Sequence, residues 1–118
     1  MTRIVTLISA AAIALALAAS TAAAPAAVKL TGTVGPGFTI SLKKGSTKVT
    51  KLAHGKYTFV IRDKSNIHNF HLKGPVSKKF TTVAFVGTKT VTLTLKPGKY
   101  TYICDPHASS MRGSFRVT

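Results

Sequence analysis

The stretch "KYTFVIRD", Lys56 to Asp63, places a large apolar side chain at every second position. Its apolar set is Tyr57, Phe59 and Ile61. A period of two is typical of a β-strand that turns one face toward a core and the other toward water. The stretch therefore predicts a half-buried antiparallel strand.

The same alternation recurs in several short segments along the chain: "FTISL" (Phe38, Ile40, Leu42), "TVTLTLK" (Val91, Leu93, Leu95) and "SFRVT" (Phe115, Val117). Turn-forming glycines and prolines separate them, as in Gly35-Pro36-Gly37 and Lys96-Pro97-Gly98. About eight short strands at such regular spacing predict an all-β fold, a two-sheet Greek-key sandwich. After the N-terminal segment, no stretch has the pattern of a helix of any length.

The first 24 residues have the layout of a secretory signal peptide. Arg3 precedes an uncharged run from Ile4 to Ala19, and small residues follow it. The run is short and alanine-rich for a membrane span, which needs about 20 strongly apolar residues. We therefore expect cleavage between residues 22 and 26, a single domain over residues 25–118, and an extracytoplasmic location (secreted, periplasmic or at the cell surface). We also expect a monomer without stable membrane insertion.

The chain is strongly basic, with 17 lysines and arginines against two acids and a formal net charge of +15. Its basic residues are spread along the sequence, as on solvated outer faces of strands. Such a charge attracts acidic proteins or anionic surfaces. The aromatic residues lie at positions that the alternation assigns to the core and not beside the lysines: Tyr57, Phe59, Tyr100, Tyr102 and Phe115. We therefore expect no exposed aromatic surface on which nucleic-acid bases could stack.

The single cysteine, Cys104, is the most informative residue. A lone cysteine usually acts as a small hydrophobe, but in an oxidising compartment an unpaired one needs a reason. His107 follows three positions later and Met111 four positions after that, and Met111 is the only methionine besides Met1. Thiolate, thioether and imidazole are soft metal donors, so their grouping indicates a metal site.

The surrounding sequence indicates where these donors lie. In "KYTYIC" the alternation of Tyr100, Tyr102 and Cys104 directs Cys104 toward the core at the end of a strand. Pro106 cannot continue the ladder of hydrogen bonds, so the strand ends there. His107 and Met111 are then expected on a loop at one end of the sandwich.

A fourth donor is expected from "SNIHNFHLKG", which offers two histidines. Strand periodicity places His68 on one face with Phe70 and Leu72, and His71 on the opposite face with Asn69. The two large apolar residues mark the first face as the interior. His68 is therefore the preferred ligand, with His71 as the weaker alternative.

The donor set is then His68, Cys104, His107 and Met111. Two imidazoles, a thiolate and a weak axial thioether form the blue-copper arrangement, which suits one copper ion cycling between Cu(I) and Cu(II). Zinc also accepts histidine and cysteine and is the chemical alternative. A structural zinc site rarely includes methionine, so zinc ranks second.

The segments "HNFHLKGP", "PGKYTYICDPH" and "ASSMRG" resemble the cupredoxins, the family of plastocyanin, azurin and amicyanin. The resemblance implies that Asn69 braces the cysteine-bearing loop by hydrogen bonds. It also implies that the edge of His107 is exposed for electron transfer in an apolar patch with Pro106, Ala108 and the 35–37 loop. Lysines around this patch would select a redox partner with an acidic surface.

The leading hypothesis is a carrier of single electrons and not an enzyme, because no nucleophile is paired with a base and Asp63 and Asp105 read as isolated acids. A copper storage or delivery protein of the same fold is the first alternative, although such proteins are often rich in methionine and histidine. The second alternative, from another class, is a metal-free cationic secreted β-sandwich that acts as a binding module.

Overall fold

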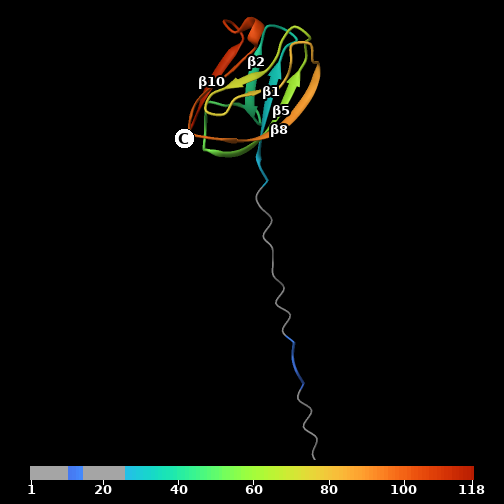
Figure 1. The fold of residues 1–118 in the computed structure, drawn as a ribbon, viewed down its shortest axis with the longest axis vertical. Helices are drawn as coiled ribbons and strands as arrows, with labels where there is room; N and C mark the ends of the chain where they lie inside the picture. The colour runs from blue at the N-terminus through green and yellow to red at the C-terminus, as the bar shows by residue number, and fades with distance from the viewer. Residues whose placement is uncertain (1–10, 15–25) are drawn as a thin grey trace, which may run out of the picture.

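The computed structural model describes residues 11–14 and 26–118. The predicted signal peptide and its cleavage zone lie almost entirely outside these residues, as does the predicted start of the domain at residue 25. In the described part of the chain, no helix has both the length and the apolar character needed to cross a membrane. The described residues form two five-stranded sheets packed face to face, which confirms the predicted all-β sandwich (Figure 1).

The first sheet has the strand order β3 (Thr47–Lys48), β2 (Ile40–Lys44), β1 (Val28–Val34), β5 (Gly55–Asp63) and β8 (Gly87–Leu95). The second sheet has the order β4 (Lys51–Leu52), β10 (Arg112–Val117), β9 (Gly98–Ile103), β6 (His71–Lys73) and β7 (Lys78–Lys79). One short 3-10 helix, η1 (Asp105–His107), follows β9.

Two details of the strands differ from the sequence prediction. The described residues form ten strands instead of about eight, because β3, β4 and β7 each have only two residues, too few to show an alternating pattern. The sheets are also mixed: β1 pairs with β5, and β4 with β10, in parallel, while the other pairs are antiparallel. Strands β2 to β4 lie between β1 and β5 in the chain, so β5 can start at the same end as β1.

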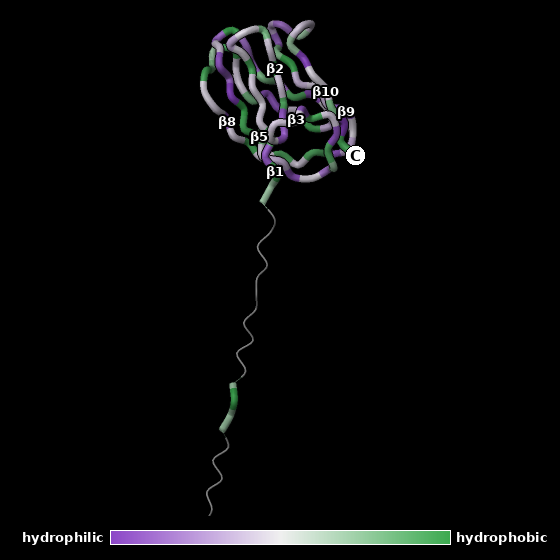
Figure 2. The backbone as a smooth tube through the Cα atoms, turned by 180° about the vertical axis from the view of Figure 1, so that it is seen from behind, coloured by the Kyte–Doolittle hydropathy of each residue, from purple (hydrophilic) through white to green (hydrophobic). Residues whose placement is uncertain are grey.

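The core lies between the sheets and contains most of the predicted inward side chains, while Ile40, Val91 and Leu93 are partly buried and pack against it. Figure 2 shows the alternation of apolar and polar residues along the strands. Aromatic rings fill much of the core: Tyr100 stacks on Phe115 with ring centroids 5.2 Å apart. Phe38 is the exception, because β2 begins only at Ile40 and the Phe38 side chain is 62% exposed.

Several strands end at the same end of the sandwich, which we call the loop pole. The last residue of β5, Asp63, pairs with Val34 at the end of β1. The last residue of β9, Ile103, pairs with the first residues of β10 and β6. The loop pole therefore carries the loops of residues 35–39, 64–70 and 104–111, and in Figure 1 it lies at the top, away from the C-terminus.

Candidate metal centre

The cysteine-bearing loop is closed by its own backbone. The amide of His107 donates to the carbonyl of Cys104 at 3.0 Å, as one turn of η1. The amides of Ser110 and Met111 donate to the carbonyl of His107 at 3.1 and 2.8 Å, and the amide of Cys104 donates to the carbonyl of Met111 at 3.1 Å. Backbone hydrogen bonds therefore fix the conformation of this loop without help from its side chains.

Three of the predicted donors meet at the loop pole. Cys104 Sγ lies 3.7 Å from His68 Nδ1 and 3.6 Å from His107 Nδ1, and the two nitrogens are 3.2 Å apart. The centre of this triangle is about 2.0 Å from each atom, close to the length of metal–nitrogen bonds and slightly shorter than metal–sulfur bonds. His68 and Cys104 are fully buried and His107 is half-buried. The triangle therefore fits a single metal ion shielded from water.

Met111, the fourth predicted donor, is buried, with 1% of its surface exposed. It lies directly before β10, and its backbone bonds to both Cys104 and His107. It is therefore fixed in the same closed loop as two of the three donors in the triangle.

The His68 loop has a different conformation from the predicted strand. Residues 64–70 belong to no strand, and β6 begins only at His71. His68 and Phe70 are fully buried, as the alternation predicted, but Asn69 is buried as well, with 1% exposed. Asn69 and His71 do lie on one side, because both side chains contact the Asp105 carboxylate. The Asn69 side chain is covered there and is not at the surface, and residues 64–70 do not form the regular strand that the alternation predicted.

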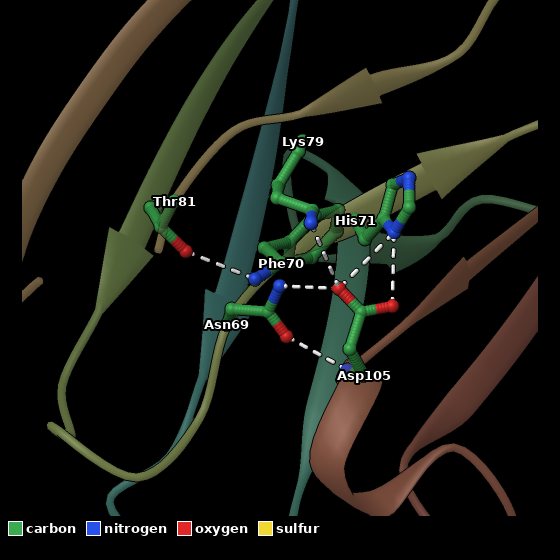
Figure 3. Close-up of polar contacts among 6 residues, drawn as sticks. All are labelled: Asn69, Phe70, His71, Lys79, Thr81 and Asp105. Carbon is green, nitrogen blue, oxygen red and sulfur yellow. Dashed lines mark hydrogen bonds and ion pairs between the residues drawn. The ribbon is translucent and has the colours of Figure 1, made fainter. Parts of the chain in front are cut away.

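Asn69 joins the two loops through Asp105. Its Oδ1 accepts a hydrogen bond from the Asp105 amide at 2.7 Å, and its Nδ2 donates to Asp105 Oδ2 at 2.7 Å (Figure 3). Asn69 directly follows His68 and Asp105 directly follows Cys104, so these two hydrogen bonds connect the residues next to two of the donors. Such contacts behind the ligands fix the orientation of the ligands themselves.

His71 does not join the donor triangle but pairs with the same carboxylate. Its Nδ1 lies 2.9 and 3.1 Å from the two oxygens of Asp105, and Lys79 Nζ lies 3.9 Å from Oδ2 (Figure 3). Burial alone would raise the pKa of Asp105, but hydrogen bonds from Asn69 and His71 and the charges of His71 and Lys79 outweigh it and lower that pKa. The sequence suggested that Asp105 is an isolated acid, but it interacts with three other side chains.

Asp63, at the end of β5, is buried with 2% exposed. Its Oδ1 accepts a hydrogen bond from the amide of Ser65 at 3.2 Å. Burial raises its pKa, although hydrogen bonds from Thr81 and Ser65 and the nearby His68 act in the opposite direction. Among the described residues, Asp63 Oδ2 and His68 Nε2 are the buried side-chain atoms that have no hydrogen-bond partner.

Phe38 is a site residue that the sequence reading missed, and Gly35, expected only as part of an apolar patch around His107, also lies against the His68 loop. The Phe38 ring lies edge-on to both histidines, with centroid distances of 5.2 Å to His68 and 5.0 Å to His107. Gly35 has φ +71°, and a Cβ there would lie 2.9 Å from Ser65 Cβ and 3.2 Å from His68 Cδ2. The Gly35-Pro36-Gly37 turn directly before Phe38 was the available signal that this aromatic belongs to a loop and not to a strand.

A β-sandwich with two histidines and a cysteine converging at one end defines a cupredoxin-type metal protein. The family model described as copper binding proteins of the plastocyanin/azurin family matches residues 36–118, and the chain belongs to this family. The predicted resemblance to the cupredoxins is thus confirmed, and copper is the cofactor that the family and the donor set define. No curated protein matches the sequence.

Solved structures share the fold at low sequence identity. A rusticyanin in which one methionine is replaced by glutamine has a TM-score of 0.53 and 23% identity, over 80% of each chain. Reduced rusticyanin has a TM-score of 0.53 and 22% identity, over 78% of this chain and 77% of that chain. A chain of a heme-copper terminal oxidase dimer has a TM-score of 0.53 and 19% identity, over 76% of this chain and 63% of that chain. At these identities the likeness describes the fold alone.

Proposed function

We propose that this protein carries single electrons between redox partners, with one type 1 copper held by His68, Cys104, His107 and Met111. The observation that carries the proposal is the triangle of Cys104 Sγ and two histidine Nδ1 atoms, with sides of 3.2 to 3.7 Å, at the loop pole. When bound there, copper supplies a one-electron couple between Cu(I) and Cu(II).

The surroundings of the donors suit this role, because they hold the ligands in one arrangement. The loop of residues 104–111 is closed by backbone hydrogen bonds, and the Asn69–Asp105 pair fixes it to the His68 loop. A site that does not rearrange between oxidation states exchanges electrons with little reorganisation. The burial of Cys104 also keeps water away from the sulfur.

His107 provides the path to the surface, because it is half-buried while His68 is fully buried. Around it lie exposed or half-exposed apolar residues: Phe38 and Pro106 are exposed and Ala108 is half-buried. The loops of residues 35–39 and 104–111 contain no lysine or arginine, so the expected ring of lysines is not part of them. A partner would therefore contact an uncharged patch.

We propose a redox partner with an acidic surface, attracted by the charge of the whole molecule. The mature chain would keep 16 basic and two acidic residues, a net charge near 16 − 2 = +14. Charge of one sign speeds the encounter with a partner of the opposite sign, and salt weakens the effect. The N-terminal segment supports an extracytoplasmic location, where a monomer acquires its copper after export.

The alternatives fit the site less well. A storage or delivery protein releases its metal, whereas Cys104, His68 and Met111 are buried. A metal-free binding module leaves the convergence of the sulfur and two imidazoles unexplained. An enzymatic role would need a positioned acid, base or nucleophile beside a substrate. The acid nearest the cysteine, Asp105, is instead committed to Asn69 and His71.

The test is a visible spectrum of the mature chain loaded with Cu(II). The wild type should be intensely blue and should bleach on reduction, and Cys104→Ser should abolish the colour. The matched pair His68→Gln and His71→Gln assigns the histidine: the first should lose the blue colour and the second should keep it. A pale wild-type complex would overturn the proposed site, and bleaching by His71→Gln alone would overturn the choice of His68.

The rate of electron exchange with an acidic partner tests the proposed partner and should fall as the salt concentration rises. A rate independent of salt would overturn the proposal that the partner has an acidic surface.

A further inference from the structure

The outer face of the second sheet is a surface of positive charge. Along β9 and β10 the inward residues are core residues such as Tyr100 and Phe115. The residues that alternate with them point outward. Across this sheet the exposed outward positions include six basic side chains: Lys51, Lys73, Lys79, Lys99, Arg112 and Arg116. We call these six residues the basic face.

The strand register brings the charges of the basic face directly opposite one another. Arg116 on β10 is the partner of Lys51 on β4 and of Lys99 on β9. Adjacent strands are about 4.8 Å apart, so three like charges form a row across three strands. Like charges in direct opposition destabilise a sheet. This row therefore costs stability unless something outside the fold compensates it.

The chain itself does not supply that compensation. Asp63 and Asp105 are its only acids, and Asp63 is buried in the core. Asp105 lies at the loop-pole end of this sheet, where it pairs with His71 and, at 3.9 Å, with Lys79. In the described part of the chain, no other lysine or arginine is within salt-bridge distance of a carboxylate. Five of the six charges of the basic face thus face water.

The first sheet is also rich in basic residues, yet most of its charges do not lie opposite one another in the strand register. There the cations on its central strands stand opposite threonines: Lys29 opposite Thr58, Lys56 opposite Thr94 and Arg62 opposite Thr88. The exception is the pair Lys43 and Lys48 on the two strands at its edge. Threonines therefore separate most charges on the first sheet, whereas the second sheet aligns three of them.

We propose that the basic face docks this protein onto the surface of a bilayer of anionic phospholipids. Its charges cover two dimensions, from β4 to β7 and along the strands, whereas a single polyanionic chain would need only a line or a groove. Each lysine or arginine held near an anionic leaflet adds to the attraction. The sign of the charge and its spread in two dimensions thus favour a surface as the partner.

Two features argue against a protein as the occupant of this face. Tight protein interfaces are anchored by buried aromatic and apolar residues, and lysine is depleted in them. The exposed large hydrophobic residues of the described chain all lie outside the strands of the second sheet: Ile13, Val28, Phe38, Ile67, Val83 and Val86. The basic face has two arginines but no exposed aromatic or large apolar side chain that could anchor a protein or insert into the bilayer.

Docking in this way leaves the loop pole accessible. The strands of the second sheet would lie along the membrane, and the loop that carries His107 follows the end of β9. His107 would then face sideways along the bilayer surface, toward partners at the same height. The proposal does not depend on copper, because the binding can be measured whether or not the site is blue.

The test is co-sedimentation of the full mature chain with vesicles of phosphatidylcholine, with and without phosphatidylglycerol. The triple variant Lys51→Gln, Lys99→Gln, Arg116→Gln removes the row. The matched variant Lys29→Gln, Lys56→Gln, Arg62→Gln removes the same charge from the first sheet. At about fivefold per residue near an anionic surface, the row variant should bind roughly 100-fold more weakly, and the matched variant should lose about fivefold or less.

The wild type should prefer the anionic vesicles and should dissociate at high salt, a measurement that needs no variant. Equal binding to both kinds of vesicle would overturn the proposal. Equal losses in the two triple variants would also overturn it, since net charge and not the basic face would then be responsible. Binding to soluble polyphosphate without binding to anionic vesicles would identify a polyanionic chain as the partner instead of a membrane. Circular dichroism checks that both variants are folded.

Discussion

The two loops that bring the donors together are stabilised in different ways. The loop of residues 104–111 is closed by four backbone hydrogen bonds among Cys104, His107, Ser110 and Met111. The loop of residues 64–70 has backbone hydrogen bonds only at its two ends, from the Lys64 amide to the Val34 carbonyl and from the Phe80 amide to the Phe70 carbonyl. Otherwise it depends on side chains: Asn69 bonds to Asp105, and the Phe70 amide donates to Thr81 Oγ1 at 2.9 Å. One half of the site is thus specified by the backbone and the other half by a few polar side chains.

This difference has a consequence for mutations. Side-chain changes in the 104–111 loop that spare the donors leave its backbone hydrogen bonds in place. Changes in the contacts of the 64–70 loop remove the groups that position His68. We therefore expect the stability of the protein to be more sensitive to side-chain changes around the 64–70 loop, which supplies one ligand, than to changes in the 104–111 loop, which supplies three.

The largest effect is expected for Asn69→Ala. It removes two hydrogen bonds of 2.7 Å, one of them to a carboxylate, and leaves the Asp105 amide without its partner. The free energy of unfolding should fall by about 3 kcal/mol, because hydrogen bonds to charged groups are worth roughly 1.5–3 kcal/mol each and unsatisfied buried groups add to the loss. Urea unfolding of the copper-free protein measures it.

Two controls sharpen this comparison. Asn66→Ala makes the same change at an exposed position of the same loop and should cost less than about 0.5 kcal/mol. Ser110→Ala removes a 3.4 Å side-chain contact from the backbone-closed loop and should be equally mild. If Ser110→Ala were as damaging as Asn69→Ala, the proposed difference between the loops would be wrong.

The same difference explains how much of the site the sequence predicts. The Cys104 loop follows local rules: a strand with period two, a proline that ends it and donors at short spacing. Its placement at the end of β9 needed no long-range information. The fold class was predictable for a similar reason, since Tyr57, Phe59 and Ile61 alternate and are all buried.

The His68 loop depends on contacts between residues far apart in the sequence. Asn69 and Asp105 are 36 positions apart, and Phe70 and Thr81 are 11 apart. Local periodicity correctly predicted that His68 points inward, but it treated Asn69 as part of a regular strand. The same periodicity placed Phe38 inside, although the ring is mostly exposed above the two histidines.

A smaller effect is expected for Thr81→Val, which keeps the shape of the side chain but removes its hydroxyl. Thr81 is 2% exposed, and the valine would leave the buried amide of Phe70 without an acceptor and would remove the hydrogen bond from the hydroxyl to Asp63. The expected loss is about 1–3 kcal/mol of unfolding free energy, the cost of one unsatisfied buried group. Thr82→Val, at the exposed neighbouring position, is the matched control and should change stability little. Equal stability of Thr81→Val and the wild type would show that the hydroxyl does not fix this loop.

The smallest effect concerns pH and separates the two acids of the site. Burial raises the pKa of Asp63, so its contribution to stability falls as pH rises from about 4, the ordinary value, through its higher folded-state pKa. The pKa of Asp105 is lowered by its partners, so its contribution is present above about pH 4 and is lost as pH falls through its lower folded-state pKa.

Asp63→Asn should therefore gain stability relative to the wild type as pH rises above about 4. Asp105→Asn should instead lose stability relative to the wild type as pH rises toward about 4 from below, and the difference should stay constant above that pH. Urea unfolding of the copper-free chains at a series of pH values measures both differences. Parallel pH profiles for the two variants would show that the two acids have the same environment. Opposite pH dependences of the two stability differences would show that the ionised form of Asp63, directly before the 64–70 loop, is destabilised by burial, whereas the ionised form of Asp105 is stabilised by its partners.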